Sequence, residues 1–285
     1  MATVLDGKAL AERGRAEIKE EVAALGQLGL ATVLVGDDAA SQIYIRRKHE
    51  AAREVGIEAT DARLPEDTTQ DELLERIAEL NGDSSVHGVL VQLPLPDQLD
   101  EAAVIRAVDP AKDVDGLHPL NAGQLYLGRP TLVPATPVGI MALLAEYDIE
   151  LTGAKAVVVG RSDIVGKPVA HLLLQQHATL SICHSRTRDL ARETLDADVL
   201  VVAVGHPALV TADMVKGGAA VVDVGMNHTE ARLVGDVDPA AMDVAGYMTP
   251  VPGGVGPMTI AMLLRNTVKA ARYRRGFLAF PKGWR

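Results

Sequence analysis

The chain has 285 residues, of which 48% are hydrophobic and 23% charged, and its formal net charge is −10. This is the composition of a globular protein with room for one large or two average domains. The acidic balance argues against nucleic acid as the main partner, because phosphate backbones require a basic face. The single cysteine, Cys183, excludes a disulfide within the chain and fits a reducing compartment.

The N-terminal 20 residues turn polar at once and lack the apolar core of a signal peptide. The longest apolar runs, such as VLVVAVG at 199–205, are far shorter than the ~20 residues of a membrane span. We therefore expect a cytoplasmic protein that binds neither membrane nor nucleic acid.

Helical and strand-like segments alternate in the first part of the chain. Helical periodicity marks 7–25, 41–56, 68–82 and 99–109, and short apolar runs that favour strands lie at 30–36 and 87–93. The segment at 68–82 opens with threonines and an acidic first turn, as helix starts do. This alternation is typical of βαβ units, so it predicts a parallel sheet covered by helices.

The alternation breaks at 110–137, a stretch rich in Pro, Gly, Asn and Asp. Loops this long are usually functional or linkers, so we expect an active-site loop and a crossover between domains. The later part has near-continuous Val and Ala runs, which suit strands buried on both faces. Strands are expected at 154–160, 178–184, 198–205 and 219–225, helices at 166–177, 188–196 and 260–273, and a second loop at 249–259.

The segment VVVGRSDIVGKPVAHLL at 157–173 has the pattern strand, turn, helix, with Gly160, Ser162 and Gly166 in the turn. The turn is one residue longer than G-x-G-x-x-G, so it fails the strict dinucleotide fingerprint. It keeps a glycine at the strand end and backbone N–H groups at a helix start that can face an anion. The alternative is a tight strand-to-helix turn that binds no ligand.

The next strand favours NADP over NAD. NAD-specific folds usually carry an acidic residue at this strand end, but the sequence here is CHSRTRD at 183–189, whose first four residues include no carboxylate. Arg161 and Arg186 offer positive charge and Ser185 a hydroxyl, which suits a 2′-phosphate. Cys183 has no evident partner base, so we interpret it as a buried thiol rather than a nucleophile.

Polar residues recur where the elements of the first part end. Tyr44 and Lys48 are four residues apart and share a helix face, and Gln92 ends a strand where open α/β sheets bind ligands. Asp113 and Asp115 begin the long loop. Each has an ordinary alternative, namely a solvated helix face, a satisfied strand end or a turn. The eight histidines show no spacing typical of a metal site, so no metal is expected.

Two further segments lie near the C-terminus. The glycine-rich PVPGGVGP at 250–257 lets backbone approach a flat ligand closely. The tail YRRGFLAFPKGWR at 273–285 holds both phenylalanines and the only tryptophan, and no acidic residue follows Asp243. We expect the aromatics to anchor the tail on this chain or on a second subunit, with binding of an anion or a partner as the alternative.

The chain resembles the bifunctional methylenetetrahydrofolate dehydrogenase/cyclohydrolase family of the FolD type. The resemblance rests on segments in family order that extend to about Ala271, and the tail is not part of the pattern. These segments are SQIYIRRK, GVLVQLPLP, KDVDG, PATPVGIM, VVVGRSDIVGKP, TLSICHSRT, VVDVGMN and TPVPGGVGPMTIAML.

The resemblance implies oxidation of 5,10-methylenetetrahydrofolate to the methenyl form with NADP, then hydrolysis to 10-formyltetrahydrofolate. It places the protein in one-carbon metabolism and purine biosynthesis, as a homodimer through its cofactor domain. It implies an α/β fold with two domains and both ligands in the cleft between them. The expected folate domain is 1–118 plus 258–285, the NADP-binding Rossmann-like domain 136–257, and the crossover 119–135.

The resemblance also assigns roles. Lys48 is the catalytic lysine of the hydrolysis, Gln92 orients it, and Tyr44 packs on the pterin. Asp115 accepts hydrogen bonds from the pterin ring, while Asp113 shapes the loop. A free lysine, with a pKa of ~10.4, is a poor base at neutral pH, so burial or a nearby cation must lower that value.

The remaining site residues implied by the resemblance fall into a folate group and a cofactor group. The folate group is Val91, Leu93, Pro250, Pro252, Gly253 and Gly254. The cofactor group is Gly160, Arg161, Ser162, Ile164, Gly166, Ser185, Arg186 and Met226. Met226 replaces the isoleucine usual in the family, a swap that conserves volume.

Three alternatives stay open. The first is a family member that has one activity or prefers NAD. The second is another two-domain α/β dehydrogenase acting on a small carbonyl or amine. The third is a non-catalytic sensor of folate or NADP on the same scaffold, although such a protein should have lost Lys48 or Gln92.

Overall fold

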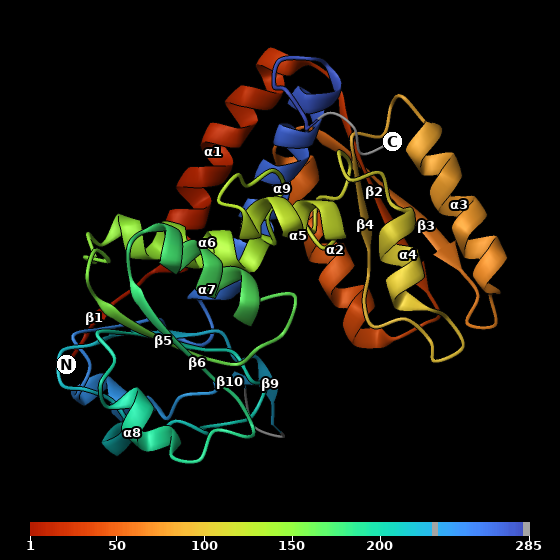
Figure 1. Cartoon of the computed structure of the whole chain (residues 1–285). Helices are drawn as coiled ribbons and strands as arrows, with labels where there is room; N and C mark the ends of the chain where they lie inside the picture. The colour runs from red at the N-terminus through yellow and green to blue at the C-terminus, as the bar shows by residue number, and fades with distance from the viewer. Residues whose placement is uncertain (230–232, 282–285) are drawn as a thin grey trace. The chain divides into compact units, whose positions relative to one another are not determined.

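The computed structural model describes residues 1–229 and 233–281, so Trp284 lies outside it. The chain forms two compact units. One comprises residues 1–12 and 136–259, and the other residues 13–135 and 260–285. Figure 1 shows the elements of both, and each unit is described by itself below.

The unit formed by 13–135 and 260–285 is built on a three-stranded parallel sheet. β2 (Leu28–Val35) lies between β3 (Ile57–Leu64) and β4 (Gly88–Val91). Both faces of β2 are buried, which explains its continuous apolar run. The helices around it are α1 (Gly7–Leu25), α2 (Ala39–Glu54), α3 (Gln70–Gly82), α4 (Glu101–Ala107), α5 (Pro119–Tyr126) and α9 (Val255–Arg274).

Successive side chains of a strand point to opposite faces of the sheet, so each face of β2 packs against different helices. Ala31 and Val33 of β2 belong to one core cluster with Leu73 and Ile77 of α3 and with residues of α4. The side chains between them face the other way, where α2 packs across β2 and β3 (Figure 1). α3 begins where Thr69 and Glu72 exchange the hydrogen bonds of a capping box, as the threonine and acidic first turn predicted.

The unit formed by 1–12 and 136–259 holds a six-stranded sheet whose paired neighbours all run parallel. Its order is β1 (Thr3–Val4), β11 (Tyr247–Met248), β8 (Ala220–Asp223), β7 (Val199–Val202), β5 (Lys155–Val159) and β6 (Thr179–Cys183). The chain goes from β5 outward to β6 and then crosses back to β7. The order of strands therefore reverses at β5, and open α/β sheets bind ligands at such points.

Helices and short segments complete this second unit. The helices are α6 (Ala135–Glu146), α7 (Gly166–Gln175) and α8 (Leu190–Thr194). Two 3₁₀ segments lie at Ala212–Met214 and Pro239–Asp243, and β9 (Asn227–His228) pairs antiparallel with β10 (Leu233–Val234). No helix in the described part of the chain is long and apolar enough to cross a membrane.

The predicted α/β class and parallel sheets are confirmed, and each predicted helix and strand is present within a few residues. The loop predicted at 110–137 is wrong in part, because it contains α5 and the first residues of α6. The loop predicted at 249–259 is also too long, since α9 begins at Val255. β3 and α6 were not predicted: β3 carries three charged residues in its eight, and α6 is too uniformly apolar to show a helical period.

The described part of the tail packs on this chain. The ring of Phe280 meets that of Tyr273 edge to face, with centroids 5.0 Å apart. Arg275 donates to the carbonyls of Leu25 and Gln27, at the end of α1 and the start of β2. Phe280 thus packs on Tyr273 of the same segment and Phe277 is 68% exposed, so the contacts that join the tail to α1 and β2 come from Arg275 and not from the expected aromatics.

Candidate active site

α2 and the end of β4 bring together the lysine, glutamine and tyrosine that the sequence singled out. Lys48 Nζ donates to Gln92 Oε1 at 3.1 Å and lies 5.9 Å from the centroid of the Tyr44 ring. Gln92 is fixed in turn, because its backbone N–H donates to Val33 O (2.9 Å) and its Nε2 to Leu93 O (2.8 Å). Tyr44 and Lys48 are thus not a solvated surface pair.

Burial and one carboxylate control the charge of this lysine. Desolvation lowers the pKa of Lys48, and the negative charge of Asp115 opposes that shift. Desolvation raises the pKa of Asp115 to about 6, against the positive charge of Lys48, which lowers it. A lysine with a lowered pKa can accept and return a proton near neutral pH, which a solvated lysine does poorly.

The loop that carries Asp115 is fixed by its neighbour Asp113. This buried carboxylate accepts hydrogen bonds from the backbone N–H groups of Leu117 (3.2 Å) and His118 (2.8 Å) and from Asn121 Nδ2 (2.8 Å). Desolvation raises the pKa of Asp113, and these hydrogen bonds act against that rise. Asp113 therefore organises the loop, while Asp115 faces the charge of Lys48.

Sequence reasoning missed two asparagines that hold the same loop. Asn121 is fully buried, donates to Pro110 O as well as to Asp113, and accepts from Thr131 Oγ1 at 2.6 Å. Asn266 on α9 donates to the carbonyls of Val114 and Val133, both at 2.8 Å. The available signal for Asn266 was an amide inside the apolar stretch of a predicted helix, since a buried amide needs partners.

Lys112 is a third missed residue, and its role differs from that of Lys48. Its side chain is fully buried, and Nζ donates to the carbonyls of Leu80 (2.8 Å) and Asp83 (2.7 Å), at the C-terminal end of α3. Desolvation and the charge of Arg274 lower its pKa to about 8. The two carbonyls account for its position, so Lys112 ties the long loop to α3.

The predicted phosphate-binding turn follows β5. Gly160 has φ +125°, and a Cβ there would lie 2.2 Å from Ala203 O, which follows β7. A Cβ on Gly166 would lie 2.3 Å from Gly160 O. Ser162 Oγ accepts from the backbone N–H groups of Val165 (3.1 Å) and Gly166 (3.3 Å) at the start of α7. Only glycine fits at both positions, so the turn keeps the close backbone that a dinucleotide requires.

The second half of the predicted cofactor site follows the neighbouring strand. Val159 of β5 pairs with Cys183 of β6, so the two strands end side by side. Ser185 and Arg186 are exposed after β6, as are Arg161 and Ile164 after β5. Burial raises the pKa of the Cys183 thiol, which agrees with its interpretation as a structural thiol.

The glycine-rich segment 250–254 lies in the same unit as this turn, not in the unit that holds Lys48. It is a packed turn, in which Gly254 N–H donates to Pro250 O (2.8 Å) and Lys8 N–H to Gly253 O (2.9 Å). The Val251–Pro252 peptide bond is cis. Met226 follows β8, and its sulfur would lie 3.6 Å from a Cβ at Gly256.

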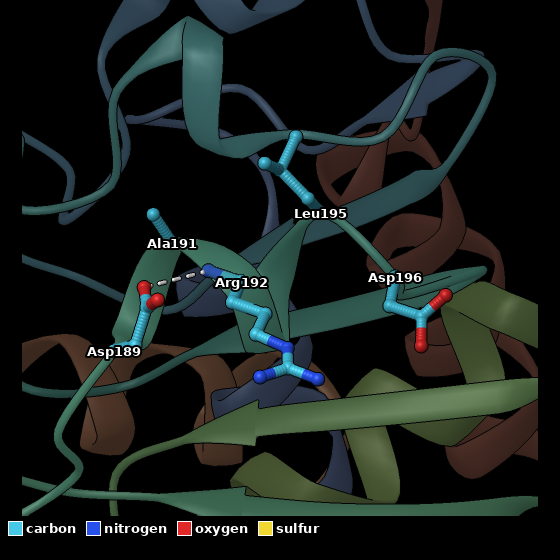
Figure 2. Close-up of a pocket in the computed structure, with 5 residues that line it drawn as sticks. All are labelled: Asp189, Ala191, Arg192, Leu195 and Asp196. Carbon is cyan, nitrogen blue, oxygen red and sulfur yellow. Dashed lines mark hydrogen bonds between the residues drawn. The ribbon is translucent and has the colours of Figure 1, made fainter.

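Of the other predicted folate residues, Val91 is buried at the end of β4, and Leu93 is half-buried beside Gln92. A surface hollow in the second unit holds none of the predicted site residues (Figure 2). Asp189, directly before α8, lines it together with Arg192 of α8 and Leu195, and the Asp189 carboxylate accepts from the Arg192 backbone N–H at 3.1 Å. No group of three potential metal ligands occurs among the residues that the structure describes.

Two family models match nearly the whole chain. The NAD(P)-binding domain of tetrahydrofolate dehydrogenase/cyclohydrolase matches residues 134–275, and the catalytic domain of the same family matches residues 5–115. The chain belongs to the tetrahydrofolate dehydrogenase/cyclohydrolase family.

Individual relatives agree with this assignment along the whole chain. The bifunctional protein FolD of Halothermothrix orenii is 56% identical over 280 residues, which cover 96% of this chain and 99% of that protein. The crystal structure of the bifunctional enzyme FolD of Campylobacter jejuni is 49% identical, with a TM-score of 0.95 over 96% of this chain and 100% of that one.

A third relative carries a ligand. The FolD structure of Trypanosoma brucei, complexed with NADP cofactor and inhibitor, is 40% identical, with a TM-score of 0.93 over 98% of this chain and 99% of that one. The resemblance inferred from the sequence segments is therefore confirmed at the level of the family.

The geometry of the lysine site leads to a prediction about Asp115. Lys48→Met should raise the pKa of Asp115 above about 6, because the positive charge of Lys48 is what lowers it. NMR titration of the Asp115 carboxyl carbon measures this value. The exposed Lys19 supplies the control, since Lys19→Met should leave the midpoint in place. An unchanged or lower midpoint in Lys48→Met would show that the two charges do not interact.

Proposed function

We propose that this family member oxidises 5,10-methylenetetrahydrofolate to the methenyl form with NADP and then hydrolyses the methenyl form to 10-formyltetrahydrofolate. The observation that carries the proposal is the hydrogen bond from Lys48 to Gln92, with the half-buried Asp115 close enough for its charge to act on Lys48. Family membership supports both reactions, since the relatives are named as bifunctional enzymes.

In the proposed hydrolysis, Lys48 moves one proton. Its neutral amine accepts a proton from water as the water oxygen bonds to the methenyl carbon. The ammonium then returns a proton to the ring nitrogen N5 as the bond between carbon and N5 breaks, and the hydroxyl proton on that carbon leaves to solvent, which forms the formyl C=O. Gln92 positions Nζ through its 3.1 Å contact, and the lowered pKa makes the neutral amine of Lys48 more available than that of a solvated lysine.

Tyr44 and Asp115 bind the substrate in this proposal. The Tyr44 ring lies beside Lys48 and offers an apolar face to the pterin, while Asp115 accepts hydrogen bonds from the pterin amino and N–H groups. Val91 and Leu93 add apolar contacts at the strand end. We also propose that folate binds to residues 1–118 plus 258–285 and NADP to residues 136–257, with residues 119–135 as the crossover. Within the NADP-binding range, we assign the segment 250–254 to folate.

The glycine cradle after β5 fits a dinucleotide, because a Cβ at Gly160 or Gly166 would fill it. NADP, when bound, accepts the hydride from the methylene carbon. Gly160 and Gly166 admit the pyrophosphate to the start of α7, and Ser162 positions that turn. Arg161, Ser185 and Arg186 would hold the 2′-phosphate, and Ile164 and Met226 would line the remainder of the site.

Family membership suggests further properties that we include in the proposal. These are a cytoplasmic location, a contribution to one-carbon metabolism and purine biosynthesis, and catalysis without a metal. An NAD-preferring enzyme and a non-catalytic sensor are the competing possibilities, and the two kinetic experiments below distinguish them.

Lys48→Met should reduce cyclohydrolase turnover by roughly 10²–10⁴-fold, because it removes the group that transfers the proton. The affinity for NADP should stay within twofold, since Lys48 does not belong to the glycine cradle. Hydrolysis is followed by the loss of methenyltetrahydrofolate absorbance, and NADP binding by calorimetry. Lys19→Met is the matched surface control. Equal losses of hydrolysis and NADP affinity would contradict the assigned role.

Arg161→Gln together with Arg186→Gln should lower kcat/KM for NADP by about 10²- to 10⁴-fold, since each charged hydrogen bond contributes about 1.5–3 kcal/mol and about 1.4 kcal/mol is tenfold. The kcat/KM for NAD should change less than twofold, because NAD has no 2′-phosphate. Arg188→Gln is the control, because Arg188 is exposed in the same turn. A wild-type enzyme that prefers NAD would overturn the 2′-phosphate assignment, and folded protein without turnover on either cofactor would favour the sensor.

We also propose a homodimer through the cofactor unit. β6 is the edge strand of the six-stranded sheet, and its Ile182 is 44% exposed. Leu174 of α7 and Leu195 beside the hollow of Figure 2 are 55% and 45% exposed. An open edge with apolar side chains is a surface that soluble proteins usually cover.

Ile182→Glu should therefore convert the dimer to a monomer, which light scattering after gel filtration measures. Leu127→Glu is the control, because Leu127 is 63% exposed but belongs to the other unit. A monomeric wild type, or a dimer that persists in Ile182→Glu, would contradict this interface.

A further inference from the structure

A cluster of arginines lies on the side of α2 away from Tyr44. Arg46 and Arg53 are seven residues apart and share one face of the helix. Arg53 is about two and a half turns from Tyr44, so the Arg53 and Tyr44 side chains lie on opposite faces of the helix. Arg63 on β3 completes the cluster. A hollow of about 120 Å³ is lined by Gln42, Ile45, Arg46, His49, Arg53, Asp61 and Arg63.

The position of α2 over the sheet explains why the helix has two distinct flanks. β2 lies between β3 and β4, and α2 packs across it. On the β4 side, Lys48 reaches Gln92. On the β3 side, His49 Nε2 lies 3.4 Å from Asp61 Oδ1. The arginine hollow and the candidate active site therefore lie on opposite flanks of one helix.

The floor of the hollow is a fixed, buried imidazole. His49 Nε2 lies 3.1 Å from Thr32 Oγ1 on β2, in addition to its contact with Asp61. Burial lowers the pKa of His49, with Arg53, Lys48 and Arg63 acting in the same direction and Asp61 against it. His49 is thus neutral at pH 7, and the charge of the hollow comes from its arginines and Asp61.

These charges are unbalanced. Asp61 is the one carboxylate in the lining. Its Oδ2 lies 3.3 Å from Arg63 Nη2, and its Oδ1 contacts His49 Nε2, so both of its oxygens already have a partner. The side chains of Arg46 and Arg53 form no hydrogen bond or ion pair with any residue in the described part of the chain, although Glu50 lies at helical spacing from both. Three guanidinium groups face one carboxylate, on a chain whose net charge is −10.

We propose that this hollow binds a small oxyanion, either inorganic phosphate or a carboxylate, between α2 and β3. Planar guanidinium groups bind such oxyanions with two parallel hydrogen bonds, and three of them here come from two elements. A volume of about 120 Å³ is ample for a small oxyanion, since a single water requires about 10–15 Å³. The site is distinct from the glycine cradle and does not depend on the proposed reactions.

The test measures phosphate binding to the full chain by calorimetry at constant ionic strength. Saturating NADP is present so that phosphate cannot bind at the cofactor turn. Wild type should bind one phosphate, and Arg53→Gln with Arg63→Gln should weaken that binding at least tenfold. Arg76→Gln is the matched control, because Arg76 is an exposed arginine of the same unit that pairs with Glu79. Replacing both residues by lysine should restore part of the affinity, because it restores the charge.

A parallel titration with acetate distinguishes the two ligand classes: tighter binding of phosphate assigns a phosphate site, and tighter binding of acetate a carboxylate site. Binding of neither anion, or binding that Arg53→Gln with Arg63→Gln leaves unchanged, would overturn the proposal. A wild-type protein that binds phosphate but turns over neither folate substrate would refute the proposed function and leave the anion site standing. Thermal unfolding gives a second readout, since phosphate should stabilise wild type and Arg76→Gln more than the double variant.

Discussion

The candidate active site depends on the burial of a lysine. An ammonium group removed from water is costly unless it is paired, and a protein can respond by pairing it or by making it neutral. Both effects act on Lys48: Gln92 Oε1 accepts a hydrogen bond from Nζ, while desolvation lowers the pKa of Lys48 and the charge of Asp115 opposes that fall. The partial balance keeps the proton of Lys48 transferable, whereas a full ion pair would hold it.

The effect of Asp115 on the pKa of Lys48 depends on the distance between them, so Asp115 must be held in one position. Hydrogen bonds to the residues around Asp115 hold the loop in place. Asp113 binds the following turn of the loop through Leu117 and His118, and Asn266 binds the carbonyl of Val114, directly before Asp115. These groups are buried and satisfied by neutral or backbone partners. The loop can therefore place one carboxylate near a lysine while the other serves only the fold.

Local sequence patterns determined much of this arrangement. The spacing of Tyr44 and Lys48 placed them on one helix face, and the strand before Gln92 placed that side chain at a carboxyl end, where parallel strands collect ligand-binding groups. The turn with Gly160 and Gly166 was also recognisable, because its close contacts exclude any side chain. In each case the pattern and the function concern residues near one another in sequence.

The features that escaped prediction depend on distant partners. α5 begins with Pro119 and ends before Gly128, in a stretch whose Pro and Gly content indicated a loop, and its stability comes from the buried Asn121 and Leu125. α6 is hydrophobic around most of its circumference, so no period marked it. Asn266 lies 152 residues from Val114, and no local pattern indicates that the two are bonded.

α2 carries residues of both kinds: some that local spacing predicts, and others that gain meaning only from partners distant in the sequence. Its flank toward β4 carries the pair that spacing predicts, and its flank toward β3 carries arginines whose significance appears only when Arg63 is placed beside them. Lys48 and His49 are consecutive, so the two flanks begin from neighbouring positions of one helix. The residues that local spacing predicts and those that only the sheet brings together therefore share one element.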